Sequence, residues 1–192
     1  MKLPDQARQA PAQPKLWLVL KSFSETALLW FFFLWLLPRW VARLEADWFG
    51  WRLPSVPEVP CWIAFWVMGL TGFYCGMLFV VIGRGTPLPL EASHCFFVLG
   101  PYRFVRNPMA LLGIGQGVIV GLLLRSPAAC LLAIVGGVAW HVSARPWEER
   151  DMRRRYGAAY EQYCSRVRNW VPNLRPHPVL ILEDCGDSTI EQ

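Results

Sequence analysis

Gly100-Pro-Tyr-Arg-Phe-Val-Arg-Asn-Pro-Met109 opens a run without charged residues that extends from Met109 to Leu124. Arg125-Ser-Pro127 interrupts the apolar sequence, which then resumes and ends at a second polar cluster, Arg145-Pro-Trp-Glu-Glu149. Two apolar segments joined by a short turn predict a helical hairpin in a membrane, with both of its ends on one side of the bilayer. We therefore expect the two polar clusters to meet in a polar pocket at the membrane boundary.

The composition of the whole chain also indicates a membrane protein. Hydrophobic residues make up 54% of the 192 residues and charged residues only 17%, whereas about 25% of the residues in soluble domains are charged. Cys61 to Gly83 contains no charged residue, and an α-helix needs about 20 residues to cross a bilayer. We expect a single membrane domain over residues 1–192, with mobile ends at residues 1–15 and 177–192.

Three further spans are predicted. One begins near Ser22 and closes at Pro38-Arg39-Trp40, a basic and aromatic boundary of the interfacial kind. The other two are the arms of the hairpin, Met109–Leu124 and Ala128–Val142. A cleaved signal peptide is an alternative for the first span, but no small-residue cleavage site follows Leu37. The predicted fold class is therefore all-α: an integral membrane protein with about four transmembrane helices, the last two forming a C-terminal hairpin.

A charged segment follows the hairpin. Tyr156, Tyr160 and Tyr163 recur near helical spacing, while arginines occupy the other faces. This pattern predicts an amphipathic helix along the membrane interface, divided at Gly157.

The distribution of Lys and Arg predicts the orientation. Fifteen of the 19 fall on the side of the two termini and four on the other side. The positive-inside rule then places both termini in the cytoplasm, and a bacterial plasma membrane and an endoplasmic reticulum membrane fit equally well.

The positive charge indicates contact with anionic lipid and not with nucleic acid, because no basic patch with stacking aromatic residues is present. The oligomeric state stays open.

The polar clusters allow two interpretations. Asn107 is a good N-cap and Pro108 suits the first helical position, so the first cluster can simply begin a helix. The same helix N-terminus, with the guanidinium of Arg106, is also suited to a carboxylate or phosphate. Glu148 and Glu149 are either acids of a first helical turn or ligands for an ammonium group opposite Arg106. Together the clusters predict a site for an amino-acid-like zwitterion.

The remaining cysteine, glycine and histidine residues allow further hypotheses. The six cysteines lack the spacing of metal ligands, so no metal site is predicted. Gly113, Gly117 and Gly121 form a small-residue face of the kind that packs helices. His141 lies near membrane depth, where an ionisable residue is a candidate for function. A non-catalytic scaffold that uses the glycine face is therefore one alternative hypothesis.

The polar clusters belong to an ordered set of motifs. The set consists of Gly83-x-Gly-Thr-Pro87, Gly100-Pro-Tyr-Arg-x-Val-Arg-Asn-Pro-Met109, Arg145-Pro-x-Glu-Glu149 and Tyr156-Gly-x-x-Tyr160-x-x-Tyr163. It resembles the integral-membrane methyltransferases of the isoprenylcysteine carboxyl methyltransferase and phospholipid N-methyltransferase superfamily. The resemblance extends over residues 83–176, a methyltransferase-like core. The sequence departs from many members of that superfamily at Ala110, where they have a tyrosine.

The resemblance implies S-adenosylmethionine as the methyl donor, bound on the cytoplasmic side. The implied cofactor-binding residues are Gly100, Tyr102, Arg106, Asn107, Pro108, Glu148 and Glu149. Arg145 and His141 are the candidate catalytic residues. The implied acceptor is lipidic or prenylated, with either an isoprenylcysteine carboxylate or a phospholipid amine as the nucleophile, and the residues do not decide between these.

Membrane sterol reductases are a second alternative. They share a similar C-terminal pattern of charged residues followed by Tyr-Gly and spaced aromatic residues, and they would imply NADPH and hydride transfer. Those proteins are larger, with more spans than this chain supplies.

Overall fold

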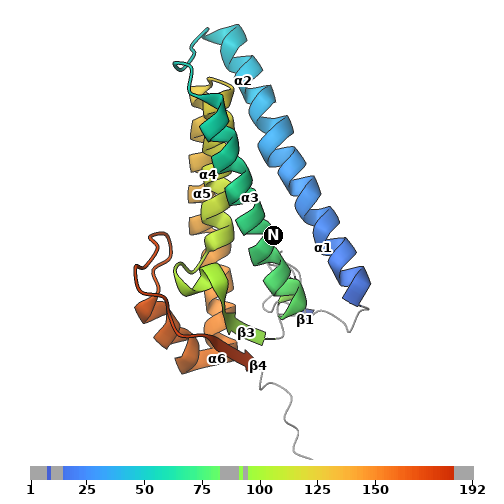
Figure 1. The fold of residues 1–192 in the computed structure, drawn as a ribbon, viewed down its shortest axis with the longest axis vertical. Coiled ribbons are helices and arrows are strands. Elements are labelled where there is room, and N and C mark those ends of the chain that lie inside the picture. The colour runs from blue at the N-terminus through green and yellow to red at the C-terminus, as the bar shows by residue number, and fades with distance from the viewer. Residues whose placement is uncertain (1–7, 10–14, 83–90, 93–94, 184–192) are drawn as a thin grey trace, which may run out of the picture. The chain divides into compact units, whose positions relative to one another are not determined.

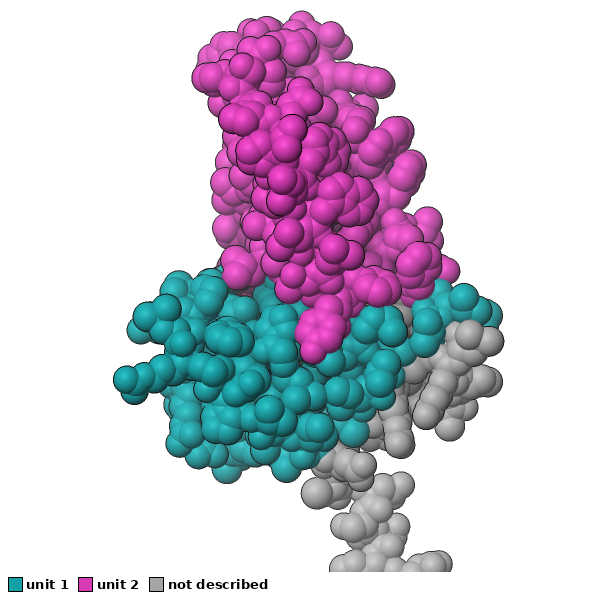
Figure 2. All heavy atoms as spheres, in the orientation of Figure 1, with its two compact units in different colours: residues 1–22, 75–108, 143–192 teal, residues 23–74, 109–142 magenta. Residues whose placement is uncertain are grey.

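The structure, a computed structural model, describes residues 8–9, 15–82, 91–92 and 95–183, and these are mostly helical (Figure 1). The chain divides into two compact units (Figure 2). Unit 1 comprises residues 1–22, 75–108 and 143–192, and unit 2 comprises residues 23–74 and 109–142. Each unit therefore combines segments that are far apart in the sequence.

Apolar helices account for most of the described chain. Three stretches are long and apolar enough to cross a membrane, at residues 19–48, 58–81 and 127–166. The second is α3, Glu58–Val81, and a fourth apolar helix, α4, Pro108–Leu123, has 16 residues. The apolar part of the third stretch is α5, Pro127–Val142, because α6, Ala144–Arg166, carries ten charged side chains. The prediction of an all-α membrane protein with a helical hairpin is confirmed.

The first long helix differs from its prediction, which ended the span at Pro38. The chain stays helical through α1 (Lys15–Trp30), a π-helical turn η1 (Phe31–Leu36) and α2 (Leu37–Trp48). A proline lacks the N–H group and crowds the carbonyl four residues earlier, which normally breaks an α-helix. Here the Leu37 N–H already bonds to Phe32 O, five residues back. The wider π turn just before Pro38 accommodates the proline, and the helix continues.

A capped turn joins α4 to α5 in unit 2. Ser126 precedes the first residue of α5, and its Oγ accepts the Ala129 N–H at 3.0 Å. The buried carboxylate of Glu45 on α2 accepts the Ala128 N–H at 3.2 Å and also the Ser126 hydroxyl. Because the first N–H groups of a helix have no partner within the helix, these acceptors satisfy the start of α5 and tie it to α2.

Replacing Glu45 with alanine should lower the free energy of unfolding by about 1–3 kcal/mol, because the buried hydroxyl of Ser126 and the half-buried N–H of Ala128 lose their acceptor. Asp47→Ala is the matched control, since Asp47 is an exposed acid two residues further along α2. Thermal unfolding of the detergent-purified variants measures the effect. Equal stability of the two variants would contradict a stabilising role for this contact.

The predicted glycine face is confirmed in part. A Cβ atom added at Gly117 would lie 2.8 Å from the Ala133 Cβ, and one added at Gly121 would lie 2.6 Å from the Cys130 backbone nitrogen. These two glycines therefore allow α4 to approach α5 closely. Gly113 would meet nothing within 4 Å, so it does not take part in this contact.

This difference between glycines can be tested directly. Gly121→Ala should destabilise the protein by about 1–3 kcal/mol, because overpacking forces the two backbones apart. Gly113→Ala makes the same chemical change in open space and should leave the melting temperature in detergent nearly unchanged. A similar loss in both variants would show that helix packing is not the cause.

Unit 1 also contains two pairs of short strands. β3, Cys95–Val98, pairs with β4, Leu180–Glu183, in an antiparallel sheet. β1, Arg8–Gln9, and β2, Glu91–Ala92, form a second, parallel pair. The sequence patterns predicted none of these strands, because each has only two to four residues.

The structure describes the first part of the predicted C-terminal tail, residues 177–183. Residues 180–183 pair with β3, and the His177 N–H donates to Arg103 O at 2.9 Å. Pairing with a distant segment gives this part of the chain a defined place. Residues 184–192, and most of residues 1–15, lie outside the described residues.

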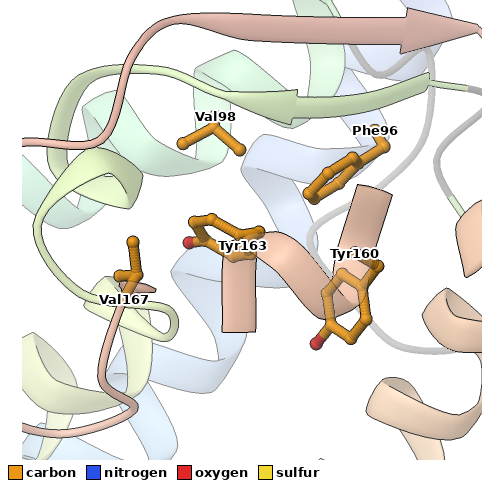
Figure 3. Packing of buried hydrophobic residues seen from close by; sticks show 5 residues of the cluster. All are labelled: Phe96, Val98, Tyr160, Tyr163 and Val167. Carbon is orange, nitrogen blue, oxygen red and sulfur yellow. The ribbon is translucent and has the colours of Figure 1, made fainter. Parts of the chain in front are cut away.

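The core of unit 1 is a cluster of aromatic and branched side chains (Figure 3). The cluster consists of Phe96, Val98, Tyr160, Tyr163 and Val167. The centroid of the Phe96 ring lies 5.6 Å from those of Tyr160 and Tyr163, in both cases with the rings edge to face. The Tyr163 hydroxyl donates to Tyr102 O at 2.7 Å. Gly157, with φ +46°, interrupts the helical backbone of α6 as predicted, between the first tyrosine of the motif and the two buried ones.

Candidate active site

The segment before α4, residues 100–107, begins with a glycine in a left-handed conformation. Gly100 has φ +50°, which is strained for residues with a Cβ atom, and it starts the short 3-10 helix η2, Gly100–Arg103. Tyr102 on η2 is buried, with its ring edge-on against Phe79 and Phe97 at centroid distances of 5.8 and 5.5 Å. Burial raises the pKa of Tyr102 well above its ordinary value. Tyr102 is therefore a packing residue here, and its contact with a cofactor stays a prediction.

Glu149 is the centre of a charge cluster that also contains Arg106, Arg145 and Arg153. Arg106 Nη1 and Arg145 Nη1 lie 3.0 and 2.9 Å from Glu149 Oε1, and Arg153 Nη2 lies 3.3 Å from Oε2. Glu149 is only 7% exposed. Arg145 and Arg153 lie one helical turn to either side of Glu149 on α6, whereas Arg106 comes from the segment before α4. The two polar clusters of the sequence thus meet, as predicted.

The charge cluster contains more positive than negative charge. Three guanidinium groups surround one buried carboxylate, and buried charge is costly unless it is paired. Arg106 Nη1 also donates to Cys164 Sγ at 3.0 Å. Arg106 Nε is buried and has no hydrogen-bond partner among the residues that the structure describes. The excess charge and the unpartnered donor suit an anionic ligand group, such as a carboxylate or phosphate.

The two glutamates of the motif differ in their surroundings. Arg106 pairs directly with Glu149, and the predicted site for an amino-acid-like zwitterion stays a prediction. Glu148 forms no ion pair with any residue in the described part of the chain. Burial, and next the neighbouring charge of Glu149, raise the pKa of Glu148 to about 7. The Glu148 carboxyl group therefore changes its charge near neutral pH.

This pKa predicts how Glu148 affects stability. The folded protein holds the Glu148 proton more tightly than the unfolded chain does, and this difference contributes to the free energy of unfolding. The contribution is complete below about pH 4.5 and is lost as pH rises through about 7. Glu148→Gln should therefore gain stability relative to the parent as pH rises from 5 to 8.

Melting temperatures across this pH range measure the effect, with Glu161→Gln, an exposed acid on α6, as the control. A difference between parent and Glu148→Gln that does not change with pH would contradict the raised pKa.

Two asparagines form a second polar contact in unit 1. Asn107 Nδ2 donates to Asn169 Oδ1, and the neighbouring Arg106 N–H donates to Arg168 O at 3.0 Å. Pro108 begins α4, as predicted. Asn169 is 8% exposed, and its Nδ2 has no partner among the described residues. Asn169 is not among the predicted site residues, because a single asparagine has no spacing signal and only the fold brings it to Asn107.

Two predicted parts of the site are not in this cluster. His141 lies in the last turn of α5 and belongs to unit 2. The motif Gly83-Arg-Gly-Thr-Pro87 lies outside the described residues. A role for either stays a prediction. Within the described ranges, no three His, Cys, Asp or Glu side chains gather in a way that could hold a metal ion.

Apolar helices long enough to span a bilayer, together with an arginine-rich cluster on a charged helix, define an integral membrane protein with a candidate site for an anionic ligand group. The model of the phospholipid methyltransferase family matches residues 59–159, more than half of the chain. The protein belongs to this family, and through it to the superfamily that includes the isoprenylcysteine carboxyl methyltransferases. It is thus a membrane methyltransferase of a family that acts on lipid-type substrates. No curated protein matches the sequence.

The family match covers the whole charge cluster. It includes Arg106, Arg145, Glu149 and Arg153, and it ends at residue 159, before Cys164 and Asn169. The resemblance seen in the motifs is confirmed at the level of the family. This membership favours the methyltransferase over the reductase and the scaffold.

Proposed function

We propose that this protein transfers a methyl group from S-adenosylmethionine to a lipidic acceptor, either a prenylated cysteine carboxylate or the amine of a phospholipid. The charge cluster around Glu149 carries the proposal, because its three arginines exceed its one carboxylate and Arg106 Nε is buried without a partner among the described residues. Family membership supports the methyl-transfer chemistry.

The amino-acid end of S-adenosylmethionine carries a carboxylate and an ammonium, and unit 1 has a group that suits each. Glu149 and Cys164 hold one nitrogen of the Arg106 guanidinium, so the direction of its remaining donors is fixed for a carboxylate. Glu148 has no arginine partner in the described residues, and its carboxylate form suits an ammonium. Bound there, S-adenosylmethionine would supply an electrophilic methyl group on a positively charged sulfur.

Arg145 and Glu149 act in this proposal as positioning residues. Arg145 Nη1 contacts Glu149 Oε1, the same oxygen that accepts from Arg106. Removing either residue would therefore change the orientation of Arg106. An amine acceptor must also lose a proton, for which His141 stays the candidate base. A carboxylate acceptor needs no base.

The orientation in the membrane is part of the proposal. We place the charge cluster and both termini on the cytoplasmic side, where a soluble methyl donor is available. The excess of Lys and Arg on that side of the predicted topology supports this orientation. A lipid-tailed acceptor then reaches the site from the bilayer.

Calorimetric binding of S-adenosylmethionine to the detergent-purified protein tests the donor site, with NADPH as the comparison ligand. Arg106→Lys keeps the charge but loses the fixed fork of donors, and it should weaken donor binding about tenfold or more, since a hydrogen bond to a charged group contributes about 1.5–3 kcal/mol. Arg150→Lys is the matched control, because Arg150 is exposed on α6 and its Nε donates to Pro146 O of its own helix. Equal affinity of all three proteins would exclude the cluster as the donor site, and binding of NADPH alone would support a reductase.

Transfer of an isotope-labelled methyl group to lipids tests the acceptor. Label should appear in the lipid fraction, and mild base should release it from a carboxyl methyl ester but not from an N-methylated headgroup. Donor binding without label in any lipid would contradict the proposed acceptor class while leaving the donor site intact.

A further inference from the structure

One loop of unit 1 combines exposed apolar side chains with positive charge. This basic loop, residues 166–179, contains three arginines and no acidic residue. Within it Leu174 is 100% exposed, and Val171 and Val179 are each more than half exposed. Transfer of such side chains out of water is favourable, and a fully exposed leucine on a folded segment forgoes this gain unless something else covers it.

Hydrogen bonds to the segment before α4 hold the basic loop in place. The Asn173 N–H donates to Phe104 O at 2.8 Å, directly before Leu174. Three residues after Leu174, the His177 N–H donates to Arg103 O at 2.9 Å, and Arg103 Nε donates to His177 O at 2.6 Å. Leu174 thus lies between two hydrogen-bonded residues, Asn173 and His177, and its exposure does not result from fraying of the chain.

The charges around Leu174 indicate what covers it. Arg166, Arg168 and Arg175 are all exposed. Exposed apolar residues beside arginines, without acidic residues, are typical of surfaces that enter the headgroup region of an anionic membrane. Trp170 in the same loop belongs to the residue type that is enriched at that boundary. A membrane is already required by the apolar helices of this chain.

We propose that the basic loop is a membrane-surface contact that binds anionic phospholipid headgroups. Val171 and Leu174 enter the boundary of the bilayer, and Arg168 and Arg175 contact the lipid phosphates. The inference does not rest on the proposed methyl transfer, because it needs only a membrane and none of these four residues belongs to the charge cluster.

Site-specific photo-crosslinking in bilayers tests the proposal. A photoreactive amino acid replaces Leu174 in the full-length protein, which is reconstituted in phosphatidylcholine with a minor share of phosphatidylglycerol. The same amino acid at Glu161, an exposed position on α6 outside the loop, is the matched control. We expect position 174 to capture lipid, with phosphatidylglycerol enriched above its share of the bilayer, and position 161 to capture much less.

Charge variants in the same experiment test the role of the arginines. Arg168→Gln and Arg175→Gln should each lower the phosphatidylglycerol enrichment by up to about fivefold, since a cation near an anionic surface contributes about 1 kcal/mol. The corresponding lysine variants should retain the enrichment. Capture of lipid without preference for phosphatidylglycerol, capture of a second copy of the chain, or no capture beyond the control would each overturn the proposal. Lipid capture at position 174 in the protein with both arginines intact decides between these outcomes, even if a glutamine variant fails to fold.

Discussion

The buried carboxylate of Glu149 needs positive partners within hydrogen-bond reach, and the fold of unit 1 brings these partners to it. Two partners, Arg145 and Arg153, come from neighbouring turns of α6 and would be available in any helix of this sequence. The third, Arg106, must be brought from a segment 43 residues earlier. This requirement places the segment before α4 against α6. The asparagine pair, the backbone bond from Arg106 to Arg168 and the hydrogen bonds of the basic loop join this same segment to α6 and the chain that follows it.

The aromatic core explains how that alignment is held. Phe96 on β3 packs against Tyr160 and Tyr163 of α6, and the Tyr163 hydroxyl bonds to the backbone of η2. Apolar burial, which is non-directional, and one hydrogen bond, which is directional, therefore hold β3, α6 and the segment before α4 together. The three arginines are oriented by their common carboxylate, Glu149.

The second buried acid, Glu45, shows why the two carboxylates have different roles. Its partners are a hydroxyl and a backbone N–H at the start of α5, all of them neutral. That contact leaves no excess of positive charge and serves to join two helices of unit 2. Glu149 is surrounded by three arginines among the described residues, a balance of charge that suits an anionic ligand. Charge balance thus distinguishes a structural contact from a candidate binding site.

The sequence alone determined the apolar helices, the turn before Pro127, the start of α4 at Pro108 and the interruption at Gly157, because each depends on local composition, spacing or backbone freedom. Its motifs also determined the family. The predicted end of the first span was wrong, because a proline indicates the end of a helix unless the π turn before it is known. Only the tertiary structure decided that Arg106 pairs directly with Glu149, that Asn169 joins Asn107 and that β4 pairs with β3. These contacts connect residues from about 40 to more than 80 positions apart, and no local pattern in a single sequence encodes the packing that brings them together.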